Sequence, residues 1–372
     1  MPPVLYHVDG FPPRTLDWER LLPFVGPAAA AVARYQGMLE AIPNADVLLA
    51  PLTTQEAVLS SKIEGTQATM GEVLQFEAAG GVTTESGAKS ADIQEVLNYR
   101  AALKHASSDM QSLPLSQRVV QNAHRVLMDG VRGHTKAPGE YRRTPVWIGP
   151  EGSPMEAARF VPISAGDITG AMSRWEKYLH SDAPDVLVQL AILHAEFEAI
   201  HPFLDGNGRL SRLLVPLFLL EKKVLARPNF YVSGFLEQNR AEYYQRLLDV
   251  SSNGDWTGWC VFFLTAVRRQ AEINEAKVRA LLELYRSDKS WIVGATHSPY
   301  AMQALDWIFA RPIFKGSDFT VGSGMPGTPA KRILRILKEH GRLVELRAGS
   351  GNRSAIVAYP ALLNIAEGAD VF

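Results

Sequence analysis

The sequence of 372 residues contains one cysteine, Cys260, so the chain cannot form an internal disulfide. This favours folding in a reducing compartment. An excess of charge of either sign is also missing, because 38 Lys and Arg residues balance 39 Asp and Glu residues, for a net charge of −1. No overall field therefore draws the protein to nucleic acid or to an anionic membrane, and any such contact has to be local.

Long apolar runs are lacking as well. The longest near the N-terminus is AAAAV at residues 28–32, whereas a helix that spans a bilayer needs about 20 apolar residues. The opening sequence MPPVLYHVDGFPPR has no charged region followed by an apolar core, so we expect no signal peptide. We therefore expect a cytoplasmic protein without membrane contact.

What the sequence does contain is a long succession of helical patterns. Apolar residues recur at helical spacing between capping residues at the start and Gly or Pro at the end. We expect Pro27 in the first turn of its helix and Thr53 at the N-cap of the next. The predicted helices cover residues 27–42, 53–64, 93–103, 118–128, 171–180, 185–200, 210–223, 241–249 and 256–286.

Two segments depart from this pattern. In residues 144–162, the β-like runs VWI and RFV flank a turn rich in Gly and Pro, which predicts a β-hairpin. From about Trp291, a helix (YAMQALDWIF) precedes a basic amphipathic helix (AKRILRILKEH) and two β-like runs, RLVEL and AIVAY. This order is typical of a winged helix-turn-helix. The basic helix has cations that could meet nucleic-acid phosphates, namely Lys331, Arg332, Arg335 and Lys338.

The stretch HPFLDGNGRLSR at residues 201–212 crowds several reactive groups into one junction. Gly206 and Gly208 permit backbone conformations in which successive N–H groups point inward as an anion nest. The positive end of the following helix faces the same spot. Arg209 and Arg212 lie on one face of that helix, and each offers a planar fork suited to phosphate oxygens.

The acid and the histidine of this stretch complete the pattern. Asp205 supplies one carboxylate, which suits Mg²⁺ because that ion takes one or two protein oxygens together with phosphates and waters. His201, with an ordinary pKa of about 6.5, is largely neutral near pH 7 and can accept a proton. Each group alone has an ordinary structural explanation, as a core histidine, a turn or a solvated helix face. Together they predict a polyphosphate cradle with a metal and a base.

The same stretch resembles the signature of the Fic family, H-P-F-x-[D/E]-G-N-G-R-x-x-R, and matches it at every defined position. The resemblance implies a nucleotidyltransferase that moves AMP from ATP to a protein Ser, Thr or Tyr hydroxyl and releases pyrophosphate. It implies that His201 deprotonates the target and that Asp205 holds Mg²⁺, or Mn²⁺ in its place. It also implies that Arg212 holds the γ-phosphate and that the α- and β-phosphates are bound by Gly206, Asn207, Gly208 and Arg209.

Two further parts of the nucleotide site follow from this resemblance. The hairpin at 144–162 is similar to the family's flap, which clamps the target segment by strand addition, and Ile148 and Gly149 would lie beside the nucleotide. Tyr243 and Tyr244 match a tyrosine pair near the adenine in many relatives. An ordinary surface hairpin and buried core tyrosines remain the alternatives.

An upstream stretch, SSKIEG at residues 60–65, matches the family's inhibitory motif, [S/T]-x-x-x-E-[G/N]. Ser60 and Glu64 are one helical turn apart and share a helix face. A solvated helix end is the alternative, since the motif alone is weak. In the family the glutamate pairs with the second arginine of the signature, which here implies Glu64 with Arg212. Such a charge-assisted bond, worth about 1.5–3 kcal/mol, would turn ATP from its productive pose.

We therefore predict a mostly α fold, in which a Fic helical bundle with a short β-hairpin flap precedes a winged helix-turn-helix domain. The predicted boundaries are 1–110 for an N-terminal helical domain with the inhibitory helix at 53–65, 111–288 for the Fic core and 289–372 for the winged domain. The resemblance also implies that chains of this architecture often associate as homodimers.

The predicted function is that of an autoinhibited protein adenylyltransferase whose partners are ATP and a protein hydroxyl, its own included. Two alternatives stay open. The same site, with Glu64 aligning a water, could remove AMP from a modified protein. The chain could instead be a regulator that binds DNA or a partner protein through residues 289–372.

Overall fold

A computed structural model describes residues 2–42, 44–81, 87–131, 135–150, 152–350 and 354–372. They form two compact units, each assembled from separate stretches of the chain. The first unit comprises Met1–Gln36, Leu59–Gly65 and Leu97–Glu272, and the second comprises Gly37–Val58, Thr66–Val96 and Ile273–Phe372. The three domain boundaries expected from the sequence stay a prediction.

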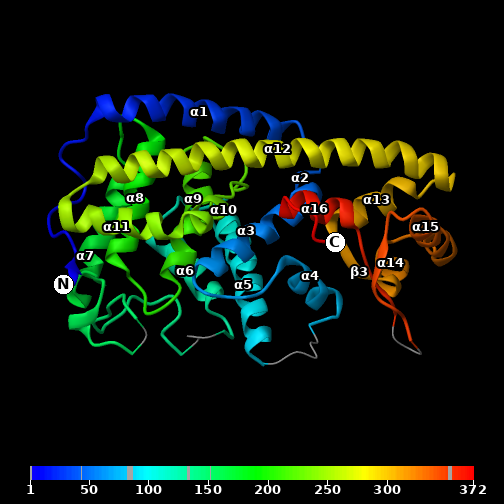
Figure 1. Ribbon diagram of the computed structural model, residues 1–372, viewed down its shortest axis with the longest axis horizontal. Helices are drawn as coiled ribbons and strands as arrows, with labels where there is room; N and C mark the ends of the chain where they lie inside the picture. Colours follow the sequence, from blue (N-terminus) through cyan, green and yellow to red (C-terminus); the bar gives the residue numbers. More distant parts are fainter. Residues whose placement is uncertain (1, 43, 82–86, 132–134, 151, 351–353) are drawn as a thin grey trace. The chain divides into compact units, whose positions relative to one another are not determined.

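Helices dominate both units, and the predicted mostly α fold class is confirmed (Figure 1). Within the described ranges, no helix has both the length and the apolar character needed to cross a membrane. Four helices contribute residues to both units: α1 (Trp18–Glu40), α3 (Ala50–Ile63), α5 (Gly87–Asp109) and α12 (Trp256–Thr296). The other α-helices of the first unit are α6 (Gln117–Leu127), α7 (Ile168–Leu179), α8 (Val186–Ile200), α9 (Asn207–Glu221), α10 (Ser233–Gln238) and α11 (Arg240–Asn253).

The roles predicted for Pro27 and Thr53 at helix starts are wrong. α1 begins at Trp18, so Pro27 lies inside the helix and not in its first turn. Its inward face, which includes Leu21 and Tyr35, is fully buried, and this burial outweighs the cost of an internal proline, about 3 kcal/mol. α3 begins at Ala50, so Thr53 is not a cap, and its hydroxyl donates to the Leu49 carbonyl one turn earlier, at 3.2 Å.

The hairpin predicted over 144–162, called the flap segment below, is mostly irregular. Its only described antiparallel pairing is a bridge between Ile148 and Phe160, in which the Ile148 N–H donates to the Phe160 carbonyl at 2.8 Å. Pro150 and Pro154 lack the N–H groups that a longer ladder needs, and a 3₁₀ turn, Met155–Ala157, follows them. The two predicted β-like runs therefore do pair with each other, but only through this one bridge and not through a longer ladder.

A short N-terminal strand that the sequence did not suggest, β1 (Val4–Leu5), supports the flap segment. It pairs in parallel with β2 (Phe160–Val161), with Val4 opposite Phe160. The next two residues anchor β1 to α8, since the Tyr6 hydroxyl donates to Glu196 Oε1 at 2.7 Å and His7 Nε2 lies 2.8 Å from Glu196 Oε2. The N-terminal stretch thus fixes one edge of the flap segment to a helix of the core.

The second unit contains the chain's C-terminal part and the short helices α2 (Ala45–Leu48) and α4 (Met70–Ala78). Its remaining elements are α13 (Ala301–Ala310), β3 (Ile313–Lys315), α14 (Gly316–Gly322), α15 (Gly327–Glu339), β4 (Val344–Arg347), β5 (Ile356–Ala358) and α16 (Pro360–Glu367). The three strands form an antiparallel sheet in the order β3-β5-β4.

The helix and strands predicted near the C-terminus are present as α13, α15, β4 and β5, whereas β3, α14 and α16 were missed because each is short. Part of the turn between β4 and β5, residues 351–353, lies outside the described residues. On α15, Lys338 pairs with Glu345 at 2.6 Å and Arg335 with Glu339 at 3.5 Å, which leaves less free positive charge than the sequence suggested. A winged helix that binds DNA or protein stays a prediction.

Candidate active site

The site begins where α8 ends. Asp185 caps the start of this helix by accepting hydrogen bonds from the Leu187 and Val188 N–H groups, both at 2.9 Å. At its C-terminal end His201 adopts a left-handed conformation with φ 49°, and its N–H donates to the Phe197 carbonyl at 3.0 Å. The chain turns sharply here, so the imidazole is held at a fixed end of a buried helix, where the sequence predicted it.

Hydrogen bonds lock the loop that follows. The side chain of Asn207 donates to the Phe203 carbonyl at 2.8 Å and accepts from the Phe203 N–H at 2.9 Å. The buried Phe203 ring stacks on His124, with centroids 3.8 Å apart. Because the Gly139 N–H donates to His124 Nδ1 at 2.8 Å, the His124 proton sits on Nε2 and is donated to the Asp205 carbonyl at 2.9 Å.

Both glycines of the signature lie against side chains that leave no room for a Cβ in this arrangement. α9 starts at Asn207, three residues before the predicted start, with Gly206 as its N-cap at φ 76°. A Cβ on Gly206 would lie 2.8 Å from Met128 Sδ, and one on Gly208 would overlap the carboxylate of Glu64. The first turn of α9 is thus packed against Met128 on one side and against the Glu64 carboxylate on the other.

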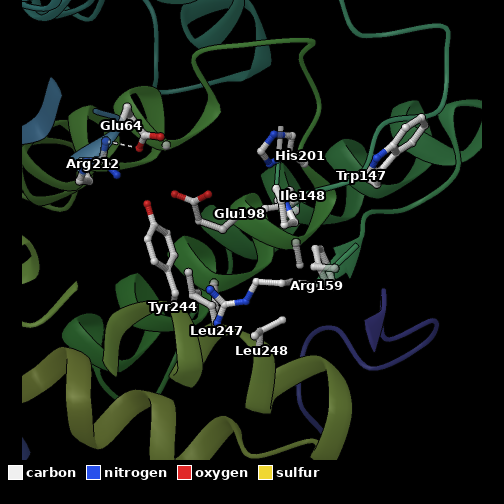
Figure 2. Close-up of a pocket in the computed structure, with 16 residues that line it drawn as sticks. Glu64, Trp147, Ile148, Arg159, Glu198, His201, Arg212, Tyr244, Leu247 and Leu248 are labelled. Carbon is white, nitrogen blue, oxygen red and sulfur yellow. Dashed lines mark hydrogen bonds and ion pairs between the residues drawn. The ribbon is translucent and has the colours of Figure 1, made fainter. Parts of the chain in front are cut away.

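The ion pair expected between Glu64 and Arg212 is present (Figure 2). Arg212 is buried and donates through Nη2 to Glu64 Oε1 at 2.6 Å and to the Ser60 carbonyl at 2.8 Å, and through Nε to Ser60 Oγ at 2.9 Å. Burial alone would lower the pKa of Arg212, but the Glu64 carboxylate raises it above its usual value. The guanidinium therefore stays charged in a buried place.

These groups open on a cavity of about 650 Å³. Glu64 and Arg212 lie together on one side of it, and His201 lies next to Ile148 of the flap segment (Figure 2). The flap segment and α11 contribute one cation, Arg159, and otherwise mainly apolar groups, namely Trp147, Ile148, Gly149, Pro150, Phe160, Tyr244, Leu247 and Leu248. The cavity therefore combines charged groups, an imidazole and apolar walls, as a nucleotide requires.

Two regions of the sequence match models of one protein family. The model of the Fic/DOC family N-terminal region matches residues 22–108, and that of the Fic/DOC family matches residues 114–219, together just over half of the chain. The chain belongs to the Fic family.

Relatives and solved structures agree with this assignment. Proteins named protein adenylyltransferase Fic from Drosophila grimshawi and Drosophila melanogaster are 30% and 29% identical over 168 residues, which is 43% of this chain and 30% of each relative. The match thus spans less than a third of those relatives. A Fic family protein from Desulfovibrio desulfuricans G20 has a TM-score of 0.60 at 21% identity and covers 93% of this chain and 98% of its own.

A second structure, a Fic domain containing signaling protein from Bacteroides thetaiotaomicron VPI-5482, has a TM-score of 0.54 at 16% identity and covers 68% of this chain and 97% of its own. At these identities, both structures show that the Fic fold is shared. They carry no further information about what this chain binds.

The Fic site does not bring all the predicted residues to the cavity wall. The residues that line the cavity do not include Asp205, Gly206, Asn207 or Arg209. The tyrosine pair is divided: Tyr244 lines the cavity, whereas Tyr243 is fully buried, with its hydroxyl 2.8 Å from His194 Nε2. Tyr243 is therefore a buried core tyrosine, whereas contact of Tyr244 with the adenine stays a prediction.

The surroundings of His201 keep its imidazole ring neutral. Burial and the nearby Arg142 lower the pKa of His201 to about 4, although the Glu64 and Asp205 carboxylates act in the opposite direction. Arg142 is fixed beside it, since its Nε donates to the His201 carbonyl at 2.8 Å. The imidazole of this Fic protein is therefore neutral near pH 7 and can accept a proton.

Asp205 lies among cations. Its Oδ2 is 3.0 Å from Lys136 Nζ, and its Oδ1 is 3.6 Å from Arg209 Nη2 and accepts from the Gly206 N–H at 2.7 Å. In the described part of the chain, no group of three or more His, Cys, Asp or Glu side chains could by itself hold a metal ion. A single carboxylate suits Mg²⁺ only when phosphates and waters supply most of the ligands.

Sequence reasoning missed Glu198, which lines the Fic cavity one helical turn before His201. Its Oε1 accepts hydrogen bonds from the Ser211 hydroxyl and, at 3.3 Å, from the Tyr243 hydroxyl. Burial raises the pKa of this carboxyl. Its spacing of three residues from His201 on one helix was the available signal, because such residues share a helix face.

Proposed function

We propose that this Fic protein is an autoinhibited adenylyltransferase, which moves AMP from ATP to a Ser, Thr or Tyr hydroxyl of a protein, its own chain included. The observation that carries the proposal is the single cavity in which His201, Gly208 and Arg212 meet. The name of the Drosophila relatives, protein adenylyltransferase Fic, agrees with it.

The proposed binding pose follows from the distribution of charge. The phosphates bind at the first turn of α9, where backbone N–H groups have no carbonyl one turn earlier to pair with. Arg209 and Arg212 add positive charge there. Because the Asn207 side chain is occupied by Phe203, we propose that Asn207 serves the phosphates through its backbone N–H and by holding the loop.

The proposed reaction is an in-line displacement at the α-phosphorus. His201 takes the proton of the target hydroxyl, and the oxygen forms a bond to the α-phosphorus. The bond between that phosphorus and the oxygen bridging to the β-phosphate breaks, and pyrophosphate leaves with its electron pair. Because the pKa of His201 is lowered to about 4, the ring is unprotonated near pH 7 and has the free lone pair that a base needs.

Asp205 is the residue proposed to hold Mg²⁺ or Mn²⁺. Its carboxylate is partly exposed, at 32% of the side chain, and lies at the loop that precedes the phosphate-binding turn. The ion would neutralise charge on the phosphates. Lys136, now 3.0 Å from Asp205 Oδ2, would have to give up this contact, so the fit is to an ion that arrives with the nucleotide.

Inhibition is proposed to come from Glu64. Its carboxylate binds Arg212 and sits against Gly208, in the place proposed for the γ-phosphate. A negative group there repels the phosphate and occupies the arginine, while 35% of the Glu64 side chain remains exposed to solvent, so that the contact can be displaced. A charge-assisted pair of this kind changes an equilibrium by about tenfold or more.

The test uses ATP labelled at the α-phosphate, with wild type, Glu64→Gly and the double variant Glu64→Gly/His201→Ala. We expect Glu64→Gly to incorporate at least about tenfold more label than wild type, and the double variant to incorporate none. Lys62→Ala, a change of an exposed residue on the same helix that pairs with Glu237, is the matched control and should behave as wild type.

Two results would contradict the proposal. Label that enters protein only from the γ-phosphate would indicate a kinase. Equal, low incorporation by wild type and Glu64→Gly, with both proteins folded, would remove the inhibitory role of Glu64.

Removal of AMP is the second candidate, because Glu64 and His201 line the same cavity and Glu64 could orient a water there. For this reaction, wild type should strip the α-label from a modified target, and Glu64→Gly should not.

A further inference from the structure

The carboxylate of Glu198 points into the cavity, in the space between Arg212, Tyr244 and Ile148 (Figure 2). A carboxylate beside a phosphate-binding site is unexpected, because it repels phosphate and is costly to desolvate. The proposed reaction gives Glu198 no role. The nearby Arg212 offsets part of the cost of the buried charge, and a ligand group that donates a hydrogen bond would offset more of it.

One oxygen of this carboxylate is already used. Oε1 accepts from the hydroxyls of Ser211 and Tyr243, and these two bonds fix the orientation of the group. For Oε2, no hydrogen bond is recorded within the part of the chain that the structure describes. An oriented acceptor is thus left for a ligand in the cavity.

The order of groups in a nucleotide indicates which one meets it. The proposed reaction places the α-phosphate beside His201, and the ribose is bonded to that phosphate through its 5′ oxygen. Glu198 lies one helical turn from His201, about 5 Å along α8. The region farther from Arg212 is lined by Leu247 and Leu248 together with the Arg159 side chain (Figure 2), and apolar groups and a planar guanidinium both suit contact with the base.

We propose that Glu198 is a specificity-determining residue, whose free oxygen accepts a hydrogen bond from the 2′ or 3′ hydroxyl of the ribose. The site would thereby select ribonucleotides over deoxyribonucleotides. Carboxylates bind ribose hydroxyls in the same manner in dinucleotide-binding folds. This inference rests on the proposed function, since it assumes that a nucleoside triphosphate occupies the cavity.

The experiment compares the binding of ATP, 2′-deoxyATP and 3′-deoxyATP to the Glu64→Gly protein by titration calorimetry with Mg²⁺. We expect at least one deoxynucleotide to bind about tenfold more weakly than ATP, or worse, because it lacks a donor to a charged acceptor. Adding Glu198→Gln should reduce this difference to about threefold or less, since a neutral acceptor is roughly half as strong.

Glu196→Gln is the matched control, because Glu196 is a second buried carboxylate of α8 but binds Tyr6 and His7 outside the cavity. It should leave the ratio of ATP to deoxynucleotide affinity unchanged. Equal binding of all three nucleotides to the Glu64→Gly protein would overturn the inference, even if Glu198→Gln fails to fold. So would a ratio that Glu198→Gln leaves unaltered, as expected if the carboxylate bound the adenine amino group.

The proposed function and this inference fail in different ways. If the Glu64→Gly protein binds ATP and transfers AMP but does not discriminate the ribose, only the role of Glu198 is wrong. If it binds no nucleotide at all, the proposed function is wrong and the inference falls with it.

Discussion

Gly206 illustrates, at the scale of a residue, why a signature position admits one amino acid. It has φ 76°, and a Cβ there would lie 2.8 Å from Met128 Sδ. Gly254, which ends α11, has nearly the same φ, 68°, but no atom within 4 Å of a built Cβ. The two glycines therefore separate the cost of a left-handed backbone from the cost of a steric clash.

We predict that Gly254→Ala lowers the free energy of unfolding by about 1–2 kcal/mol, the cost of a left-handed backbone. Gly206→Ala should cost about 1–3 kcal/mol more, since the methyl group also has to displace Met128. Urea denaturation of both variants measures the difference. Equal losses would mean that Met128 moves aside freely and that the glycine is required only for its conformation.

At the scale of elements, α8 is the support of the site. Its first turn is capped by Asp185, whose carboxylate accepts two backbone hydrogen bonds at 2.9 Å, and its last turn delivers His201. α6 contrasts with it, because Ser116 stands at its N-cap without a side-chain hydrogen bond. The helix that carries the base thus has a side-chain cap, whereas α6 does not.

We predict that Asp185→Ala destabilises the protein by about 1–2 kcal/mol, because two N–H groups lose their acceptor. Ser116→Ala should change the stability by less than about 0.5 kcal/mol. Denaturant unfolding monitored by circular dichroism tests the pair. A loss at Ser116 as large as that at Asp185 would show that the caps are equivalent in solution.

For the whole molecule, three histidines with lowered pKa values make the stability depend on pH. Burial is the main reason that the pKa falls to about 4 for His124, about 3 for His194 and about 4 for His201. In the unfolded chain each has a pKa of about 6.5. Between about pH 6.5 and 4 the unfolded chain binds more protons, so the stability is complete above this window and is lost as the pH falls through it.

We predict that unfolding near pH 5 takes up about three protons at these histidines, equivalent to about 4 kcal/mol per pH unit. His194→Gln should reduce the uptake by about one proton, because the amide does not titrate. Unfolding free energies measured at several values between pH 7 and 5 give both slopes. Identical slopes for the two proteins would mean that His194 is protonated in the folded state.

The local features of this Fic protein were determined by its sequence alone. The Asp185 cap and the left-handed turn at Gly206 depend on residues a few positions apart, so α8 and the start of the signature loop were predictable. The family signature also implied that Glu64 pairs with Arg212, and the pair is present. The predicted starts of α1 and α3 failed because packing outweighed the local signals of Pro27 and Thr53.

Only the tertiary structure decided which distant groups complete the site. His124 and Asp205 are 81 positions apart, Tyr6 and Glu196 are 190 apart, and no local pattern announces either contact. The same holds for the place of Glu198, whose helix face was predictable but not the cavity it faces. Helix caps and turns depend on neighbours in the chain, so the sequence could predict them. Burial and long-range hydrogen bonds depend on how the whole core packs, so only the tertiary structure could show them.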